Sequence, residues 1–242
     1  MKKRIISAVL CVIFLMSGTG PVLAGARLGT DLTISVGTKL WYNSWNKWLF
    51  NTGNGNLLSN RSEDNEMSLL PSLSLKYKKF FLTGSWMLPT EYTFPGHPSI
   101  GNTFKMEREE MDVNAGYYVT PSLGLTGGYK AIKQTLGEGT AGGFIDYTGP
   151  TLGILGSAGI GNGLAIYGNA AYGFMEMERN SGTVDATYTS SELGLAYIPT
   201  PMVSLTLGYK YQVVKSECDS ANPDKTCTDL TNGFLLGANL IF

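Results

Sequence analysis

The stretch that decides the fold is the last one, GFLLGANLIF at positions 233–242. Every second side chain in it is apolar, namely Phe234, Leu236, Ala238, Leu240 and Phe242. The positions between them include Gly233, Gly237 and Asn239. Because successive side chains of a β-strand point to opposite faces, this alternation predicts a strand with one apolar face and one face of small or polar residues.

The same period-two pattern recurs along the chain from Asp31 onward. Residues 203–213 set Val, Leu and Tyr at odd positions against Ser, Thr, Gly, Lys and Gln at even positions. Residues 32–40, 72–77, 111–119 and 123–130 alternate in a similar way. Residues 145–160 are harder to divide into two faces because they contain Pro150 and many glycines. Ten such segments are predicted, and a count of eight or twelve would leave the interpretation unchanged.

The connections between these segments alternate in length. Short ones are predicted at residues 78–79, 120–122, 161–163 and 199–201, and longer ones near 44–65, 89–104, 135–141, 178–183 and 218–227. Short turns at one end and longer loops at the other are typical of transmembrane barrels. A soluble sandwich would also alternate, but the aromatic residues near the segment ends fit two membrane-interface girdles. The sequence therefore predicts an all-β, transmembrane, antiparallel up-and-down barrel.

The N-terminus carries an export signal. Lys2, Lys3 and Arg4 form a positive region, residues 5–16 an apolar region too short to span a membrane, and residues 24–26 a small-residue cleavage site. We therefore expect residues 1–26 to be a cleaved signal peptide and residues 27–242 to be the barrel. Removal of three basic residues changes the formal net charge from −1 to −4, because that segment holds no acid. Such a charge gives no electrostatic reason to expect nucleic acid as a partner.

The terminal Phe242, with apolar residues at every second position before it, resembles the C-terminal recognition signal of bacterial outer-membrane proteins. The whole mature chain is similar in pattern to the small barrels that share the fold of outer-membrane protein A, enlarged by one hairpin. The resemblance implies an integral protein of the bacterial outer membrane, surrounded by lipid and lipopolysaccharide. It also implies that the barrel assembly machinery reads the last strand.

The alternation directs seven charged side chains into the barrel, in a belt near mid-height and above a zone of Ser, Thr and Gly. These residues are Lys39, Arg108, Glu110, Asp112, Lys130, Glu192 and Lys210. On the lipid side a central Lys or Arg would cost about 2–4 kcal/mol, so an inner position is expected. The belt could be a network that fills the interior or the constriction of a narrow pore. Eight strands are just filled by side chains and 16–18 leave a channel, so ten strands favour the filled interior.

Little in the chain indicates catalysis, a metal site or a cofactor. The single histidine, His97, lies between prolines and glycine, without an acid or serine at a spacing that suggests a partner. Omptin protease barrels also have ten strands, but they use an Asp–His pair that nothing adjoining His97 would supply. Cys218 and Cys227 are expected to form a disulfide, since an exported chain with an even pair favours one. A metal site is the competing interpretation of this pair.

The first long loop is expected to carry aromatic residues, among them Trp45, Trp48 and Phe50. They could contact lipid headgroups, a saccharide or a partner protein, or fold inward and cap the barrel mouth. The first function that we expect is therefore a structural or surface-interaction role through the outer loops, without enzymatic activity and without a cofactor. The alternative is a narrow porin-like channel for ions or small polar solutes.

Overall fold

The structure is a computed structural model that describes residues 32–50, 57–95, 103–136, 144–179, 182–217 and 226–242. The predicted signal peptide lies outside these residues and stays a prediction. All regular elements within the described ranges are β-strands. They are β1 (Leu32–Phe50), β2 (Leu57–Arg61), β3 (Glu66–Tyr77), β4 (Phe80–Phe94), β5 (Phe104–Thr120), β6 (Leu123–Leu136), β7 (Phe144–Gly161), β8 (Leu164–Arg179), β9 (Gly182–Thr200), β10 (Val203–Glu217) and β11 (Thr226–Ile241). The described part of the chain contains no helix with the length and hydropathy needed to cross a membrane.

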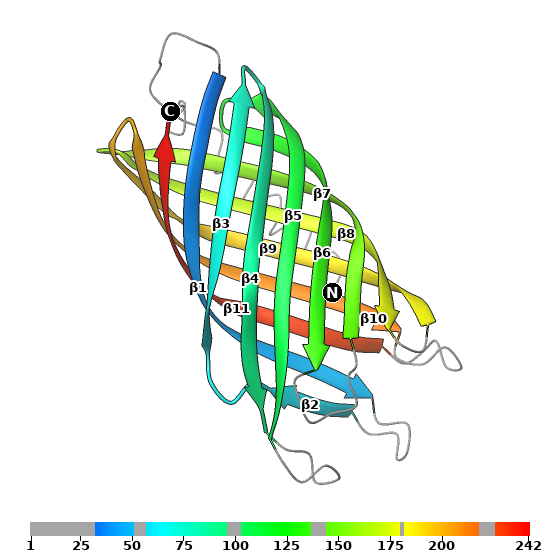
Figure 1. Cartoon of the computed structure of the whole chain (residues 1–242). Coiled ribbons are helices and arrows are strands. Elements are labelled where there is room, and N and C mark those ends of the chain that lie inside the picture. The colour runs from blue at the N-terminus through cyan, green and yellow to red at the C-terminus, as the bar shows by residue number, and fades with distance from the viewer. Residues whose placement is uncertain (1–31, 51–56, 96–102, 137–143, 180–181, 218–225) are drawn as a thin grey trace, which may run out of the picture.

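Ten of these strands close into one ring. From β3 to β11 each strand pairs antiparallel with the next, β3 also pairs with β1, and the β11–β1 pairing completes the ring. The short strand β2 is attached to the edge of β1 over residues 46–50 of that strand. Figure 1 shows this closed, tilted arrangement, with the ends of β3 and β11 at the top and β2 at the bottom. The predicted ten-stranded up-and-down barrel is confirmed.

The two ends of the barrel differ. Two-residue turns follow β3, β5, β7 and β9, at residues 78–79, 121–122, 162–163 and 201–202, and we call this the turn-side end. Lys78 and Asn162 have positive φ values of 56° and 53° there, which two-residue hairpin turns require. The opposite end, which carries the other connections and β2, is the loop-side end. In transmembrane barrels the short turns face the periplasm and the loops face outward.

The outer surface is an apolar belt with aromatic rings at both borders. Tyr77, Tyr117 and Tyr197 are exposed near the turn-side end. Tyr42, Trp86, Tyr129, Tyr172 and Tyr209 are exposed toward the loop-side end. Exposed Leu, Val and Met side chains lie between them, including Val36, Leu73, Val113, Leu195 and Leu207. Such an exposed apolar band between two aromatic girdles is a lipid-facing surface.

Several strands continue further toward the loop-side end than the sequence indicated. The predicted loop at residues 44–65 is wrong over most of its length, because β1 runs to Phe50 and β2 pairs with it. The predicted loop at 89–104 is also too long, since β4 runs to Phe94 and pairs with β5. A membrane strand needs about 9–11 residues, whereas β1 has 19 and β5 has 17. The hydrogen-bonded ladder therefore extends beyond the lipid, where polar side chains on the outer face are stable.

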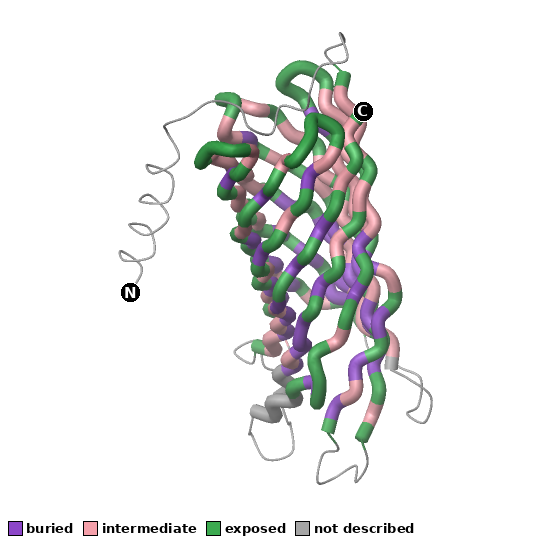
Figure 2. The backbone as a smooth tube through the Cα atoms, turned by 90° about the vertical axis from the view of Figure 1, so that its left-hand side faces the viewer, coloured by how far each residue is buried: buried purple, intermediate pink, exposed green. Residues whose placement is uncertain are grey.

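The interior is filled unevenly. Buried residues are concentrated in the half of the barrel away from the C-terminal end, and intermediate exposure prevails near that end (Figure 2). The loop-side half contains two clusters of buried apolar side chains, one around Trp45, Tyr92 and Phe94 and one around Ile132, Tyr147 and Tyr188. The turn-side half contains a cavity of about 430 Å³. Any functional interior site therefore consists of a packed loop-side part and a hollow turn-side part.

A close backbone approach explains one glycine of β7, the strand that the sequence left least defined. An added Cβ at Gly149 would lie 2.1 Å from the carbonyl oxygen of Phe174. Gly149→Ala is therefore expected to destabilise the barrel by about 1–3 kcal/mol, the usual cost of overpacking. Urea unfolding of the chain refolded into lipid vesicles, followed by circular dichroism, measures this. Gly84→Ala is the matched control, because nothing lies within 4 Å of its added Cβ. Equal midpoints for the two variants would contradict the packing explanation.

Candidate functional site

The lumen of the barrel is the candidate functional site. The structure places all seven residues of the predicted belt there, as the alternation of the strands requires: Lys39, Arg108, Glu110, Asp112, Lys130, Glu192 and Lys210. Their contacts divide them into separate sets. Arg108, Glu110, Lys130 and Asp112 form one group, Lys39 and Glu192 form a second, and Lys210 lies beside a tryptophan ring.

Arg108 is the centre of the first group. Its side chain is fully buried. Its Nη1 donates to Asp229 Oδ1 at 2.7 Å, and its Nε donates to Glu110 Oε1 at 2.9 Å. The guanidinium also lies 5.2 Å from the centre of the Trp45 ring. Two carboxylates and an aromatic face therefore balance the charge of this buried cation, as its loss of contact with water requires.

Lys130 extends this group toward the turn-side end. Its Nζ donates to Glu110 Oε2 at 2.7 Å and to Asp112 Oδ2 at 3.3 Å. Asn114 Nδ2 donates to the other oxygen of Asp112. Alternating positive and negative groups therefore run from Asp229 through Arg108, Glu110 and Lys130 to Asp112.

Two carboxamides carry the network straight across the lumen. Gln212 Nε2 donates to Glu110 Oε1 at 2.6 Å, and Gln134 Nε2 donates to Asp229 Oδ2 at 2.7 Å. Counted round the ring of ten, β10 lies five strands from β5, and β11 lies five strands from β6. Both bonds therefore connect diametrically opposite walls. We call Lys47, Arg108, Glu110, Lys130, Gln134, Gln212 and Asp229 the cross-barrel network.

Aromatic side chains cover this network on the loop side. Trp45 lies with its ring centre 5.2 Å from those of Tyr92 and Phe94, both in edge-on contact. Its indole Nε1 donates to Asp229 Oδ1 at 3.0 Å. The assignment of Trp45 to a loop is wrong. It belongs to β1 and is fully buried, because its ring packs inside the barrel while its N–H completes the hydrogen bonding of a buried carboxylate.

The second group lies nearer the turn-side end. Lys39 Nζ donates to Glu192 Oε1 at 2.7 Å, and Tyr167 Oη donates to the same oxygen at 2.9 Å. Lys210 lies opposite Glu192 in the β9–β10 register. Its Nζ lies 4.6 Å from the centre of the Trp41 ring.

The predicted belt left out four members of the cross-barrel network, Lys47, Gln134, Gln212 and Asp229, although Gln212 was already placed on the polar face of residues 203–213. Lys47 fell within the predicted loop near 44–65, and Asp229 fell between the predicted loop near 218–227 and the last predicted strand, which began at Gly233. The alternation already contained the signal, because two-residue steps from Gly233 lead to Thr231 and Asp229, and steps from Lys130 lead to Gln134. Both Thr231 and Gln134 are fully buried.

The other predicted residues lie elsewhere. The apolar set of the last strand, Phe234, Leu236, Ala238, Leu240 and Phe242, is exposed on the outer face. Its role in assembly stays a prediction. Trp48 and Phe50 end β1, and their side chains lie outside the described part of the structure. Cys227 lies at the start of β11, but Cys218 and His97 are outside the described residues, so the disulfide stays a prediction.

No protein-family model matches the chain, and no curated protein matches it. Solved structures do resemble it. The outer-membrane protease OmpT from Escherichia coli matches with a TM-score of 0.54 and 12% identity, over 90% of this chain and 99% of that one. Neisserial surface protein A matches with a TM-score of 0.41 and 13% identity, over 87% and 97% of the two chains. OprG from Pseudomonas aeruginosa matches with a TM-score of 0.38 and 11% identity, over 87% and 95%.

At these identities the likeness shows the fold, and the fold is that of a small Gram-negative outer-membrane barrel. The lipid-facing belt described above requires a membrane around it. The protein is therefore a closed ten-stranded β-barrel of the bacterial outer membrane, as the sequence predicted.

Proposed function

We propose that this protein is a non-conducting outer-membrane barrel that acts through its loop-side end, in a structural or surface-interaction role. The observation that carries the proposal is the pair of hydrogen bonds between diametrically opposite walls, from Gln212 to Glu110 and from Gln134 to Asp229. Arg108, Gln134 and Gln212 are each 0% exposed. Side chains that bridge the lumen and exclude water leave no path for ions between them.

The number of hydrogen bonds that hold the cross-barrel network together also supports the proposal. Each carboxylate of the network accepts hydrogen bonds from a buried cation and from a carboxamide. Breaking a buried ion pair costs about 3–5 kcal/mol, so thermal motion would rarely separate the side chains of the cross-barrel network. A rigid, occluded core suits a barrel that displays its outer end rather than one that passes solutes.

Single-channel recording of the refolded mature chain in a planar bilayer tests the proposal. We expect no discrete conductance steps from correctly folded barrel, because the cross-barrel network closes the lumen. Heat-dependent migration on a gel, a property of folded barrels, checks that the inserted protein is native. Reproducible steps from native protein, shifted by neutralising Asp112 or Lys210, would reject the closed barrel.

The second candidate function is a narrow channel for ions or small polar solutes. One observation favours it, the cavity of about 430 Å³ that occupies the turn-side half of the lumen. A channel would also need the cross-barrel network to move aside. The same recording separates the two functions, since only a channel produces steps.

We propose further that the barrel is not an enzyme, although the E. coli structure that shares its fold is a protease. Four carboxylates of the described lumen, Glu110, Asp112, Glu192 and Asp229, form ion pairs with lysine or arginine. Carboxylates held in this way neutralise buried cations. Peptide hydrolysis by the refolded chain that disappeared in His97→Ala would contradict this part of the proposal.

A further inference from the structure

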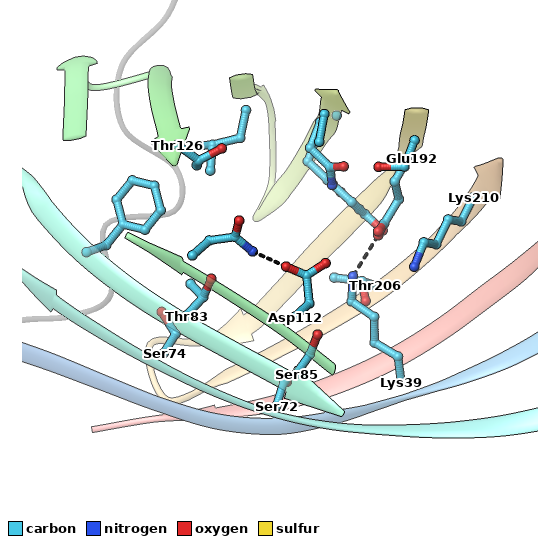
Figure 3. Close-up of a pocket in the computed structure, with 18 of the residues that line it drawn as sticks. Lys39, Ser72, Ser74, Thr83, Ser85, Asp112, Thr126, Glu192, Thr206 and Lys210 are labelled. Atoms are coloured by element: carbon cyan, nitrogen blue, oxygen red, sulfur yellow. Dashed lines mark hydrogen bonds and ion pairs between the residues drawn. The ribbon is translucent and has the colours of Figure 1, made fainter. Parts of the chain in front are cut away.

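The turn-side half of the lumen contains a cavity that the closed-barrel function does not use. Its volume of about 430 Å³ falls in the range of roughly 300–1,000 Å³ typical of small-molecule sites. Hydroxyl groups from many strands face it, among them those of Ser72, Ser74, Thr83, Ser85, Thr126 and Thr206 (Figure 3). The rings of Phe81, Tyr118 and Tyr167 also line it. Hydroxyls and flat rings together are the groups that recognise a small hydroxylated molecule.

Two carboxylates at the cavity are already neutralised. Asp112 pairs with Lys130, and Glu192 pairs with Lys39. In Figure 3 the Lys39 and Glu192 side chains meet across the cavity wall, and a dashed line marks their ion pair. Neither acid therefore presents an unpaired negative charge to a ligand in the cavity.

Lys210 differs from the other interior cations. Its side chain lines the cavity (Figure 3), and its Nζ lies 4.6 Å from the centre of the Trp41 ring. Within the ranges that the structure describes, this ammonium makes no hydrogen bond or ion pair, although Glu192 lies on the neighbouring strand β9 and Asp112 on the opposite wall. Lys39, Arg108 and Lys130 each have a carboxylate partner, and Lys47 donates to Gln134.

The cations of the cross-barrel network and the neighbouring cavity wall outnumber the carboxylates there. The cations of the two groups and the network are Lys39, Lys47, Arg108, Lys130 and Lys210, and the carboxylates are Glu110, Asp112, Glu192 and Asp229. Five positive charges against four negative ones leave one in excess within this set, and among the described residues Lys210 is its one cation whose ammonium has neither a hydrogen bond nor an ion pair. A further lysine, Lys76, lies over the ring of Tyr118 near the turn-side end of the cavity. The cavity is thus electropositive, and a single negative charge would neutralise Lys210.

We propose that this cavity binds a small hydroxylated monocarboxylate, with the Lys210 ammonium against its carboxylate and the Ser and Thr hydroxyls around its hydroxyl groups. A charge-assisted hydrogen bond is stronger than one between neutral groups, so Lys210 supplies the preference for an anion. The hydroxyls both donate and accept, so they suit a polyhydroxylated body. The site lies on the periplasmic side of the cross-barrel network and is reached without passing through it.

Isothermal titration calorimetry of the refolded chain in detergent micelles tests the inference with glucuronate as the probe. We expect glucuronate to bind. Glucose has a similar size and no charge, so its affinity is expected to be lower by about tenfold or more. This comparison uses the unchanged protein, so it does not depend on whether a variant folds. Absence of glucuronate binding, or equal binding of glucose, would overturn the proposal.

Two variants then locate the site. Lys210→Met removes the ammonium but keeps an unbranched side chain only one atom shorter, and it is expected to weaken glucuronate binding by about tenfold or more, with little change in glucose binding. Lys215→Met is the matched control, because Lys215 lies on the same strand and is exposed on the outer face. Equal losses in the two variants would overturn the assignment of Lys210. Tighter binding of inorganic phosphate than of glucuronate would overturn the hydroxylated carboxylate as the ligand class. Binding in micelles is independent of conduction, so it can fail while the closed barrel stands.

Discussion

Replacing Arg108 with methionine is expected to lower the free energy of unfolding by about 3–5 kcal/mol, the cost of breaking a buried ion pair from one side. The variant leaves Asp229 with the indole N–H of Trp45 and the amide of Gln134, and Glu110 with Lys130 and Gln212. Two buried carboxylates would then share one fewer cation. Urea unfolding of the barrel in lipid vesicles, followed by circular dichroism, gives the difference.

Lys105→Met is the matched control for this substitution. Lys105 lies on the same strand and pairs with Glu91 at 2.6 Å, but both side chains are more than half exposed. Exposed pairs contribute little, because water solvates both partners once they separate. We expect no measurable change in the midpoint of Lys105→Met. A similar midpoint for Arg108→Met would show that the cross-barrel network does not stabilise the closed lumen.

Trp45→Ala is the second substitution with a large expected effect. Removing a fully buried tryptophan leaves a void between Tyr92 and Phe94 and deprives Asp229 of a hydrogen bond. Large-to-small changes of this kind cost about 3–5 kcal/mol. The same unfolding measurement by circular dichroism applies, since tryptophan fluorescence would itself change.

Trp86→Ala provides the comparison, because Trp86 is half exposed on the lipid-facing surface. Its removal creates no internal void, and lipid chains can fill the space. We expect a clearly smaller loss of stability than for Trp45→Ala. If the two variants lost equal stability, Trp45 would have to be regarded as an interface residue, as its assignment to an outer loop first implied.

The fold could be predicted from the sequence because one physical rule governs nearly every strand. A side chain faces either lipid or lumen, so residues 203–213 or 111–119 show their two faces directly. The rule weakens beyond the lipid, where the outer face can be polar. Residues 44–50 carry Ser, Asn and Lys on both faces, and they were therefore assigned to a loop although they continue β1.

The sequence allowed us to predict which residues face the lumen, but it did not allow us to predict which of them pair with one another. Alternation alone directs Lys39, Glu192 and Lys210 inward. Which carboxylate meets which lysine depends on strand tilt and on the packing of side chains across the lumen. Glu192 is level with Lys210 in the register, yet its ion pair is with Lys39 on β1. Asp229 was missed because the last strand was begun at Gly233, four residues too late to include it.

The pairing of β1 with β11 joins residues that are about two hundred positions apart in the sequence, such as Ser35 and Ile241. Every other neighbouring pair in the ring can form as a local hairpin, whereas this one requires the whole chain to be in place. Until the two edges meet, each presents unpaired backbone groups, and the bonds from β5 and β6 to β11 have no wall to reach. The last step of folding is therefore the closure of the ring, and it forms the β1–β11 ladder and the ion pairs of the interior together. An unclosed barrel is destabilised by unpaired backbone groups at its two edges and by buried charges without their partners.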